Sequence, residues 1–293
     1  MMLLLNILEQ SLVFLPFTLG MFISYGLLKR ADLTVDGSFV SGAGVFAKLI
    51  LLGFPTSLAM AASVTAGAFA GIGTSALQYR DRISSLISGI LVLFILQSIN
   101  LIAMGRPNLN ILGKATLLNR FDPLFGEENG KLLVLTALSL VLVGSLAVLL
   151  SSRTGIMLRA FGCNPQLVSL LGKRAELFRF LGLATSNALV AYSGALTAQF
   201  HGYADIGMGT GLVLIGIGTV MIGKQIESLV TVKIPSSLTQ ILCCLAGVLM
   251  YFAVINGLAS MGVNPLYLKM LVGCTLAVVL LLQVTKSRQG VLQ

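Results

Sequence analysis

Long runs of apolar residues, each close to the length of a membrane span, dominate this chain of 293 residues. About twenty apolar residues in a helix cross the hydrocarbon core of a bilayer. The runs are continuous instead of alternating with a period of two, which argues against a transmembrane β-barrel. With 10% charged residues and a mean hydropathy of +0.97, the chain lacks the polar surface of a soluble globular protein. The sequence therefore predicts an all-α fold, a polytopic transmembrane helical bundle.

Nine segments are candidate spans, and together they predict one transmembrane domain over residues 1–293. They are residues 11–28, 37–54, 56–77, 83–104, 131–151, 177–200, 207–223, 237–257 and 266–284. The second, third and seventh segments are short and rich in glycine, so their ends are the least defined.

Basic residues are distributed unevenly between these segments, and the asymmetry predicts the orientation of the chain. Cytoplasmic loops of membrane proteins carry an excess of Lys and Arg. An N-terminus outside places thirteen basic residues in or beside the cytoplasmic loops, namely Lys29, Arg30, Arg80, Arg82, Arg153, Arg159, Lys173, Arg174, Arg179, Lys224, Lys233, Lys286 and Arg288. Four face the other side, namely Arg106, Lys114, Arg120 and Lys131. We therefore expect a cytoplasmic C-terminus, and we attribute the net charge of +9 to this asymmetry, not to nucleic-acid binding.

The predicted outer connection, residues 105–130, is long and mixes Pro, Asn, Gly and charged residues. Long connections in compact proteins are often functional. A functional element and a solvated excursion both remain open for this loop.

The sequence contains no motif typical of an enzyme active site or a metal site. The segment Gly218–Lys224 (GTVMIGK) matches the start of a phosphate-binding loop, but Gln225 replaces the Ser or Thr that would bind Mg²⁺. Its glycines lie in an apolar span, where they favour close helix packing. The single histidine, His201, is best interpreted as a loop residue at the outer end of the sixth span. We therefore expect no catalytic residue, no metal site and no cofactor bound by this chain.

The predicted cytoplasmic loop 152–176 carries the signals of a very short helix. Asn164 is a good N-cap, Pro165 suits the first helical position, and Gly172 suits the residue after the helix. A helix of two turns is not stable alone in water. Either it lies on the membrane surface, or a groove of a cytoplasmic partner receives its apolar side chains, which are Leu167, Val168, Leu170 and Leu171.

Two acidic residues each precede a glycine-rich span. Asp36 precedes GSFVSGAGVF, and Asp205 precedes IGMGTGLVLIGIG. The two spans run in opposite directions in the expected topology. Paired glycine-interrupted segments of this kind point to an inverted repeat with a substrate pathway between its halves. The repeat would relate spans one to four with spans six to nine, unless the matching glycines are a coincidence.

Polar residues inside spans are costly, and they usually face a cavity or a neighbouring helix. Gln97 and Asn100 share one helix face because they are three residues apart. Nine polar residues lie inside the predicted spans, namely Ser38, Ser41, Gln97, Asn100, Ser186, Asn187, Ser193, Thr197 and Gln199. Each could bond to a neighbouring helix or line the substrate pathway, and the sequence leaves both roles open. With Asp36 and Asp205, the candidate pathway residues are Ser38, Gln97, Asn100, Ser186, Asn187, Ser193 and Thr197.

The stretch RTGIMLRAFGCNPQLVSLLG resembles the coupling loop of permease subunits of ATP-binding-cassette (ABC) importers of the branched-chain amino acid and ribose type. The segment SNALVAYSGALTAQFHGYADIGMGTGLVLIGIGTVMIG, with DLTVDGSF near the N-terminus, is similar to the subgroup of these permeases that works with tryptophan- or tyrosine-binding lipoproteins. Cys163 departs from the pattern, since a polar or charged residue is expected before Asn-Pro. The residues that match the coupling motif are Arg159, Gly162, Asn164, Pro165, Leu167, Leu170, Leu171 and Gly172.

The resemblance implies the permease subunit of an ATP-driven importer that moves a small solute, such as an aromatic or branched-chain amino acid, inward across the cytoplasmic (inner) membrane. Its implied partners are cytoplasmic ATPase subunits, an extracytoplasmic substrate-binding protein and a second permease copy, in a homodimer or heterodimer. ATP would be bound and hydrolysed by the ATPase subunits, so this chain would be a transport subunit and not an enzyme. The residues alone leave open a secondary transporter that works without a partner ATPase.

Overall fold

A computed structural model of the chain describes residues 2–119, 127–229, 237–262, 270 and 273. Its elements in chain order are α1 Met2–Met21, the π-helix η1 Phe22–Leu27, α2 Thr34–Leu51, α3 Thr56–Leu77, the 3₁₀-helix η2 Tyr79–Asp81, α4 Ser85–Met104, β1 Asn108–Asn110, α6 Glu127–Ser151, α7 Arg153–Cys163, α8 Pro165–Leu170, α9 Ala175–His201, β2 Tyr203–Asp205, α10 Leu212–Leu229 and α11 Ser237–Ser260.

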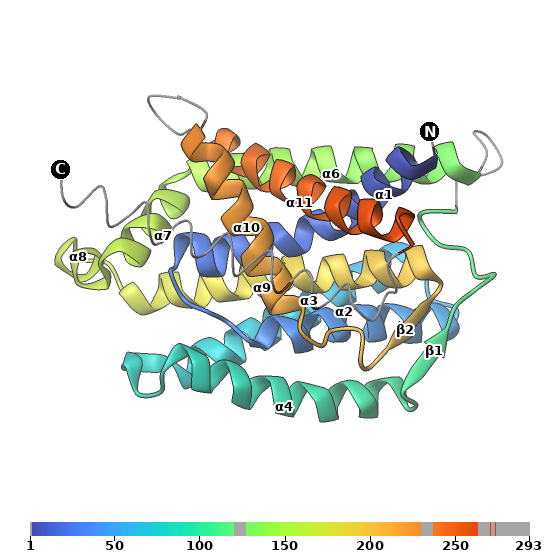
Figure 1. Ribbon diagram of the computed structural model, residues 1–293. Helices are drawn as coiled ribbons and strands as arrows, with labels where there is room; N and C mark the ends of the chain where they lie inside the picture. The colour runs from blue at the N-terminus through green and yellow to red at the C-terminus, as the bar shows by residue number, and fades with distance from the viewer. Residues whose placement is uncertain (1, 120–126, 230–236, 263–269, 271–272, 274–293) are drawn as a thin grey trace.

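The long helices form an elongated bundle in which most helices run roughly parallel or antiparallel to one another (Figure 1). Strands β1 and β2 lie at one end, near the start of α1, and α8 lies at the opposite end. We call these the β end and the α8 end. The two strands pair antiparallel, with Leu109 opposite Ala204. This small sheet is the one departure from the predicted all-α fold within the described residues.

Six described helical segments are long and apolar enough to cross a membrane. They are Leu3–Leu27, Thr34–Leu51, Thr56–Asp81, Ser85–Met104, Asn129–Ser151 and Ser237–Ser260. Each overlaps one of the nine predicted spans. The predicted sixth and seventh spans correspond to α9 and α10, which are helical but are not among these six. The ninth, 266–284, lies almost wholly outside the described residues, so about nine spans stays a prediction.

Helices α1 and α9 pack against each other within the bundle. α9 also packs against α2 and α3, whereas α1 also packs against α11, α6 and α10. The predicted inverted repeat stays a prediction.

The contact between α2 and α9 depends on small residues. A Cβ atom on Gly42 would lie 1.9 Å from the Ala191 carbonyl oxygen, and one on Gly194 would lie 2.0 Å from that of Phe39. No side chain fits at such distances, so the two backbones approach each other directly. Close approach through small residues is the usual way in which membrane helices associate.

The loop 152–176 differs from its prediction in one respect. It contains the predicted short helix, α8, but also an unpredicted one, α7 Arg153–Cys163. α7 forms because Leu158 and Phe161, three residues apart, lie on one buried face. They pack with Leu28 and Phe178 of distant segments, which the loop sequence does not reveal.

The predicted span 207–223 also needs correction, because α10 begins at Leu212 and ends at Leu229. The residues before it continue from β2 in a non-helical conformation. The Ile206 amide donates to the Pro107 carbonyl (3.0 Å), which holds the start of this segment next to β1. Asp205 therefore ends a strand at the β end and does not open a helix.

Candidate functional site

The N-terminal end of α2 is fixed by a buried carboxylate. The Thr34 amide donates to Asp32 Oδ1 (2.9 Å), and Asn187 Nδ2 of α9 donates to Asp32 Oδ2 (2.8 Å). The hydroxyl of Ser38 then donates to Asn187 Oδ1 (2.6 Å). Asp32, Ser38 and Asn187 are fully buried. Because a charge is costly within a membrane, such residues are usually functional and keep a partner.

The N-terminal end of α10 meets the first turn of α2. Asp36 Oδ2 accepts from the Gly211 amide and Oδ1 accepts from the Val213 amide, both at 2.9 Å. A carboxylate at a helix N-terminus satisfies free amide groups and interacts favourably with the helix dipole. Gly211, with φ +82°, adopts a left-handed conformation that glycine allows at low cost. Asp36 thus caps a helix that begins 176 residues after it, at Leu212.

A third polar contact ties α4 to this region. Asn100 Nδ2 donates to the Gly37 carbonyl (3.0 Å), and the Ser41 hydroxyl donates to Asn100 Oδ1 (2.7 Å). Four of the predicted polar residues, Ser38, Ser41, Asn100 and Asn187, therefore lie around the start of α2. Their hydrogen bonds hold α2, α4 and α9 together where the N-terminal ends of α2 and α10 meet.

A cavity of about 220 Å³ lies beside Asp36, between α2, α4 and the segment 206–210. The predicted pair Gln97 and Asn100 lines it together, as their shared face on α4 indicates. Its lining is Asp36, Gly37, Val40, Leu93, Phe94, Gln97, Asn100, Ile206, Gly209 and Thr210. The mixture of polar groups with Leu, Phe and Val suits a small amphipathic molecule.

A second cavity, of about 260 Å³, is lined in part by Met208 and Leu212, which belong to the same segment as the lining residues Ile206, Gly209 and Thr210 of the first. The predicted residue Thr197 is part of its lining, but aromatic side chains predominate there. The lining consists of Phe14, Phe39, Thr197, His201, Tyr203, Met208, Leu212, Ile215, Tyr251, Phe252 and Ile255. The ring centroids of Phe14 and Phe252 are 5.6 Å apart in an edge-on arrangement. Such a lining favours flat apolar groups.

Three other predicted pathway residues have different surroundings. The hydroxyls of Ser186 and Ser193 donate to the Gly20 and Val13 carbonyls of α1, at 2.7 and 2.8 Å, so this face of α9 bonds to a neighbouring helix. Asp205 accepts from Asn108 Nδ2 (3.2 Å) at the β end.

At the α8 end, the predicted helix signals of the loop 152–176 are present. Asn164 Oδ1 accepts from the amides of Gln166 (2.9 Å) and Leu167 (3.4 Å), and Gly172 adopts φ +70°. Leu170 is 85% exposed, whereas Val168 is fully buried against α7 and α9. α8 is thus anchored on one side by Val168 and presents leucines on the other.

Two more residues of the coupling motif fix the base of α8. Arg159 Nη2 donates to the Ser237 hydroxyl at the start of α11 (3.0 Å). Gly162 lies against the Leu27 carbonyl oxygen, which a Cβ atom on this glycine would meet at 1.7 Å. Both contacts hold α7 to the ends of other helices.

Comparison with known proteins places the chain in a family. Residues 3–280 match the model of the branched-chain amino acid transport system permease component. The chain belongs to this permease family. Over 276 residues it is 44% identical to an uncharacterised protein of Rickettsia prowazekii (strain Madrid E), which covers 94% of this chain and 96% of the relative.

A second relative of this permease carries a functional name. The tyrosine transport system permease protein of Clostridioides difficile (strain R20291) is 34% identical over 218 residues, which is 74% of this chain and 72% of the relative. No solved structure is significantly similar to the permease. The resemblance to amino-acid transport permeases is therefore confirmed, and the chain is a multi-pass membrane protein of amino-acid transport.

The site of this permease contains residues that the sequence interpretation missed. Asp32 was not a candidate, although Asp two residues before a helical Thr is a typical N-terminal signal. The aromatic residues of the second cavity are also absent from the predicted site. They come from α1, α2, α9, β2 and α11, and no local pattern brings these elements together.

Proposed function

We propose that this chain is the permease subunit of an ABC importer that moves an amino acid, aromatic or branched-chain, inward across the cytoplasmic membrane. The observation that carries the proposal is α8, whose Leu167, Leu170 and Leu171 are exposed at the end of the bundle. Leucines on so short a helix need a covering surface, since a helix of this length gains little stability from its own hydrogen bonds. In this proposal a groove of the ATPase subunit is that surface.

The two cavities support an amphipathic substrate. A free amino acid combines a charged backbone with a side chain, and the Asp36 cavity and the aromatic cavity together offer polar groups and flat apolar surface. The name of the Clostridioides difficile relative, a tyrosine transport system permease protein, agrees with an aromatic side chain. The proposed assembly also contains an extracytoplasmic binding protein and a second permease copy.

The competing proposal is a secondary transporter, which needs no ATPase. Uptake of labelled tyrosine and leucine in cells that express the complete transporter distinguishes the two. We expect uptake to stop when ATP is depleted and to persist when a protonophore collapses the proton gradient at constant ATP. We also expect the chain to co-purify with an ATPase. Loss of uptake with the protonophore alone, without a co-purifying ATPase, would favour the secondary transporter.

The proposed orientation places the β end outside and the α8 end in the cytoplasm. Two exposed positions test it, namely Asn119 near the β end and the native Cys163 beside α8. We expect a membrane-impermeant maleimide to label Asn119→Cys in intact cells when the native cysteines are replaced by serine. A chain that retains Cys163 alone should be labelled only after the cells are opened. The opposite pattern would reverse the orientation.

A further inference from the structure

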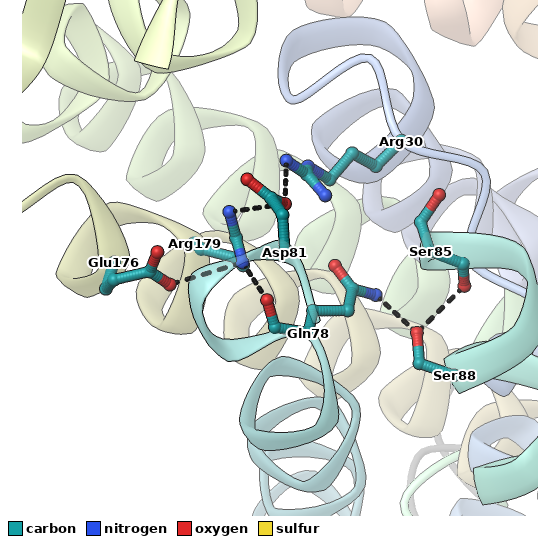
Figure 2. A network of polar contacts seen from close by, with 7 residues as sticks. All are labelled: Arg30, Gln78, Asp81, Ser85, Ser88, Glu176 and Arg179. Atoms are coloured by element: carbon teal, nitrogen blue, oxygen red, sulfur yellow. Dashed lines mark hydrogen bonds and ion pairs between the residues drawn. The ribbon is translucent and has the colours of Figure 1, made fainter. Parts of the chain in front are cut away.

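A network of charged side chains joins three segments at the α8 end (Figure 2). Asp81 Oδ1 accepts from Arg30 Nη2 (3.0 Å) and from Arg179 Nη2 (2.9 Å). Arg179 also donates to the Gln78 carbonyl and forms an ion pair with Glu176 Oε2 (3.2 Å). The Arg179 side chain is only 1% exposed, whereas that of Asp81 is 61% exposed. A buried guanidinium is thus held by a carboxylate that water can reach.

The three segments have different positions in the fold. Arg30 lies between η1 and α2, Asp81 ends η2 between α3 and α4, and Arg179 lies in the second turn of α9. The Asp81 carboxylate therefore connects the segment before α2, the turn between α3 and α4, and the start of α9. Of these helices, α2 and α4 line the Asp36 cavity, and α3 and α9 pack against α2. Arg179 is also bonded to Glu176 and the Gln78 carbonyl, so separation of Arg30 from the exposed Asp81 carboxylate leaves the buried Arg179 guanidinium paired.

The turn at residues 80–81 has an unusual backbone. Arg80 and Asp81 have φ values of +55° and +52°, in the left-handed region, which is costly for Arg and less so for Asp. Such a conformation persists only when surrounding contacts hold it. The two arginines bonded to Asp81 are contacts of this kind, and the turn is free to relax when they separate.

The network is also in contact with the base of α8. The guanidinium carbons of Arg30 and Arg179 lie 5.8 Å and 5.7 Å from the centroid of the Phe161 ring. Phe161 is in α7, and it belongs to the same buried apolar cluster as Val168 of α8. Because packed side chains move together, a displacement of α8 acts on both arginines through this cluster.

On its other side the network leads to the candidate site. Arg30 stands two residues before Asp32, whose carboxylate accepts from the Thr34 amide at the start of α2. The first turn of α2 contains Asp36, which caps α10 and lines the cavity. A shift of Arg30 therefore changes the position of the helix start around which the cavity is built.

We propose that Asp81 is the positioning residue of a latch, Arg30–Asp81–Arg179, that keeps the α8 end closed and opens when α8 is displaced. The proposal rests on the proposed function, because the ATPase supplies the displacement. Opening separates Arg30 from Asp81, relaxes the turn at residues 80–81 and frees the start of α2. Closing restores the Arg30–Asp81 ion pair and ends the transport cycle.

Reversible cross-linking tests whether the latch must open. Arg30→Cys and Asp81→Cys are combined in a chain whose native cysteines are replaced by serine, and a bifunctional methanethiosulfonate reagent bridges the two. We expect uptake to stop on bridging, to resume on reduction, and the ATPase to remain bound throughout. In each single-cysteine variant the reagent should leave uptake at the level measured for that variant before treatment. Undiminished uptake by the bridged protein would overturn the proposal.

A charge-removing variant tests the role of Asp81 in coupling. Asp81→Asn keeps a residue that tolerates a left-handed backbone but removes the charge. In the reconstituted complex we expect Asp81→Asn to raise the rate of ATP hydrolysis without solute about fivefold, which is the low end of typical coupling between two sites. Association of the ATPase with the permease should be unchanged. Asp81→Glu should restore much of the coupling, and Arg82→Gln, a neighbouring exposed charge, should behave like the wild type.

Wild-type hydrolysis and uptake in Asp81→Asn would contradict the latch, since a purely structural ion pair predicts that result. If Asp81→Asn does not accumulate in the membrane, the cross-linking result decides. Different results would refute the proposed function and the latch. If the wild-type chain bound no ATPase, the proposed function would be refuted. Arrest of uptake by the cross-link would even then support a latch that opens during transport.

Discussion

Leu170→Asp is expected to abolish both ATPase association and solute uptake while the permease remains folded and inserted. Leu170 is 85% exposed, so the substitution disturbs no contact within the described chain. In the proposed complex the leucine is covered, and burying one leucine is worth about 1.5–3 kcal/mol. An unpaired carboxylate in the same groove costs several kcal/mol more, about enough to lower affinity by a factor of thousands.

Co-purification of the ATPase with each variant measures this effect, together with uptake in vesicles. Leu112→Asp is a matched control, because Leu112 is an exposed leucine at the β end and should not affect ATPase binding. Asn164→Ala should have a milder effect, since losing an N-cap costs about 1 kcal/mol. Normal association of Leu170→Asp with the ATPase would reduce α8 to an ordinary surface turn, and the secondary-transporter proposal would then be preferred.

Asp36→Asn is expected to reduce uptake about tenfold or more at an unchanged amount of protein in the membrane. Asp36 uses both carboxylate oxygens to accept from the amides of Gly211 and Val213. An asparagine offers one oxygen, and its NH₂ group would face the second amide. A donor left without an acceptor costs about 1–3 kcal/mol, and 1.4 kcal/mol corresponds to a factor of ten. The start of α10, which lines the second cavity through Leu212, would then lose its fixed position.

The matched control is Asp205→Asn. Asp205 accepts from Asn108 Nδ2 (3.2 Å) and from the Gly207 amide (2.8 Å), in a turn at the β end. We expect at most a small loss of uptake from this change, because it leaves the contact between α2 and α10 intact. Equal uptake by Asp36→Asn and the wild type would remove Asp36 from the candidate site. Equal loss of uptake in both variants would instead support the sequence-based prediction that Asp36 and Asp205 both lie along the substrate pathway.

The features that the sequence predicts correctly depend on residues close together in the chain. The cap of α8 is one example, because Asn164 bonds to amides two and three residues later. The shared position of Gln97 and Asn100 at one cavity is another, since helical spacing alone puts them on one face. The membrane helices belong to the same class, because a run of apolar residues predicts its own burial or contact with lipid.

Tertiary structure decided the features whose partners are distant in the chain. Asp36 and Gly211 are 175 residues apart, so no local pattern shows that a carboxylate of α2 caps α10 or that α10 begins at Leu212. The bonds from Arg30 and Arg179 to Asp81 span 51 and 98 residues. Apolar runs and caps are local properties of the chain. Which acid meets which helix end depends on how the helices pack, because only packing brings such distant groups within hydrogen-bond distance.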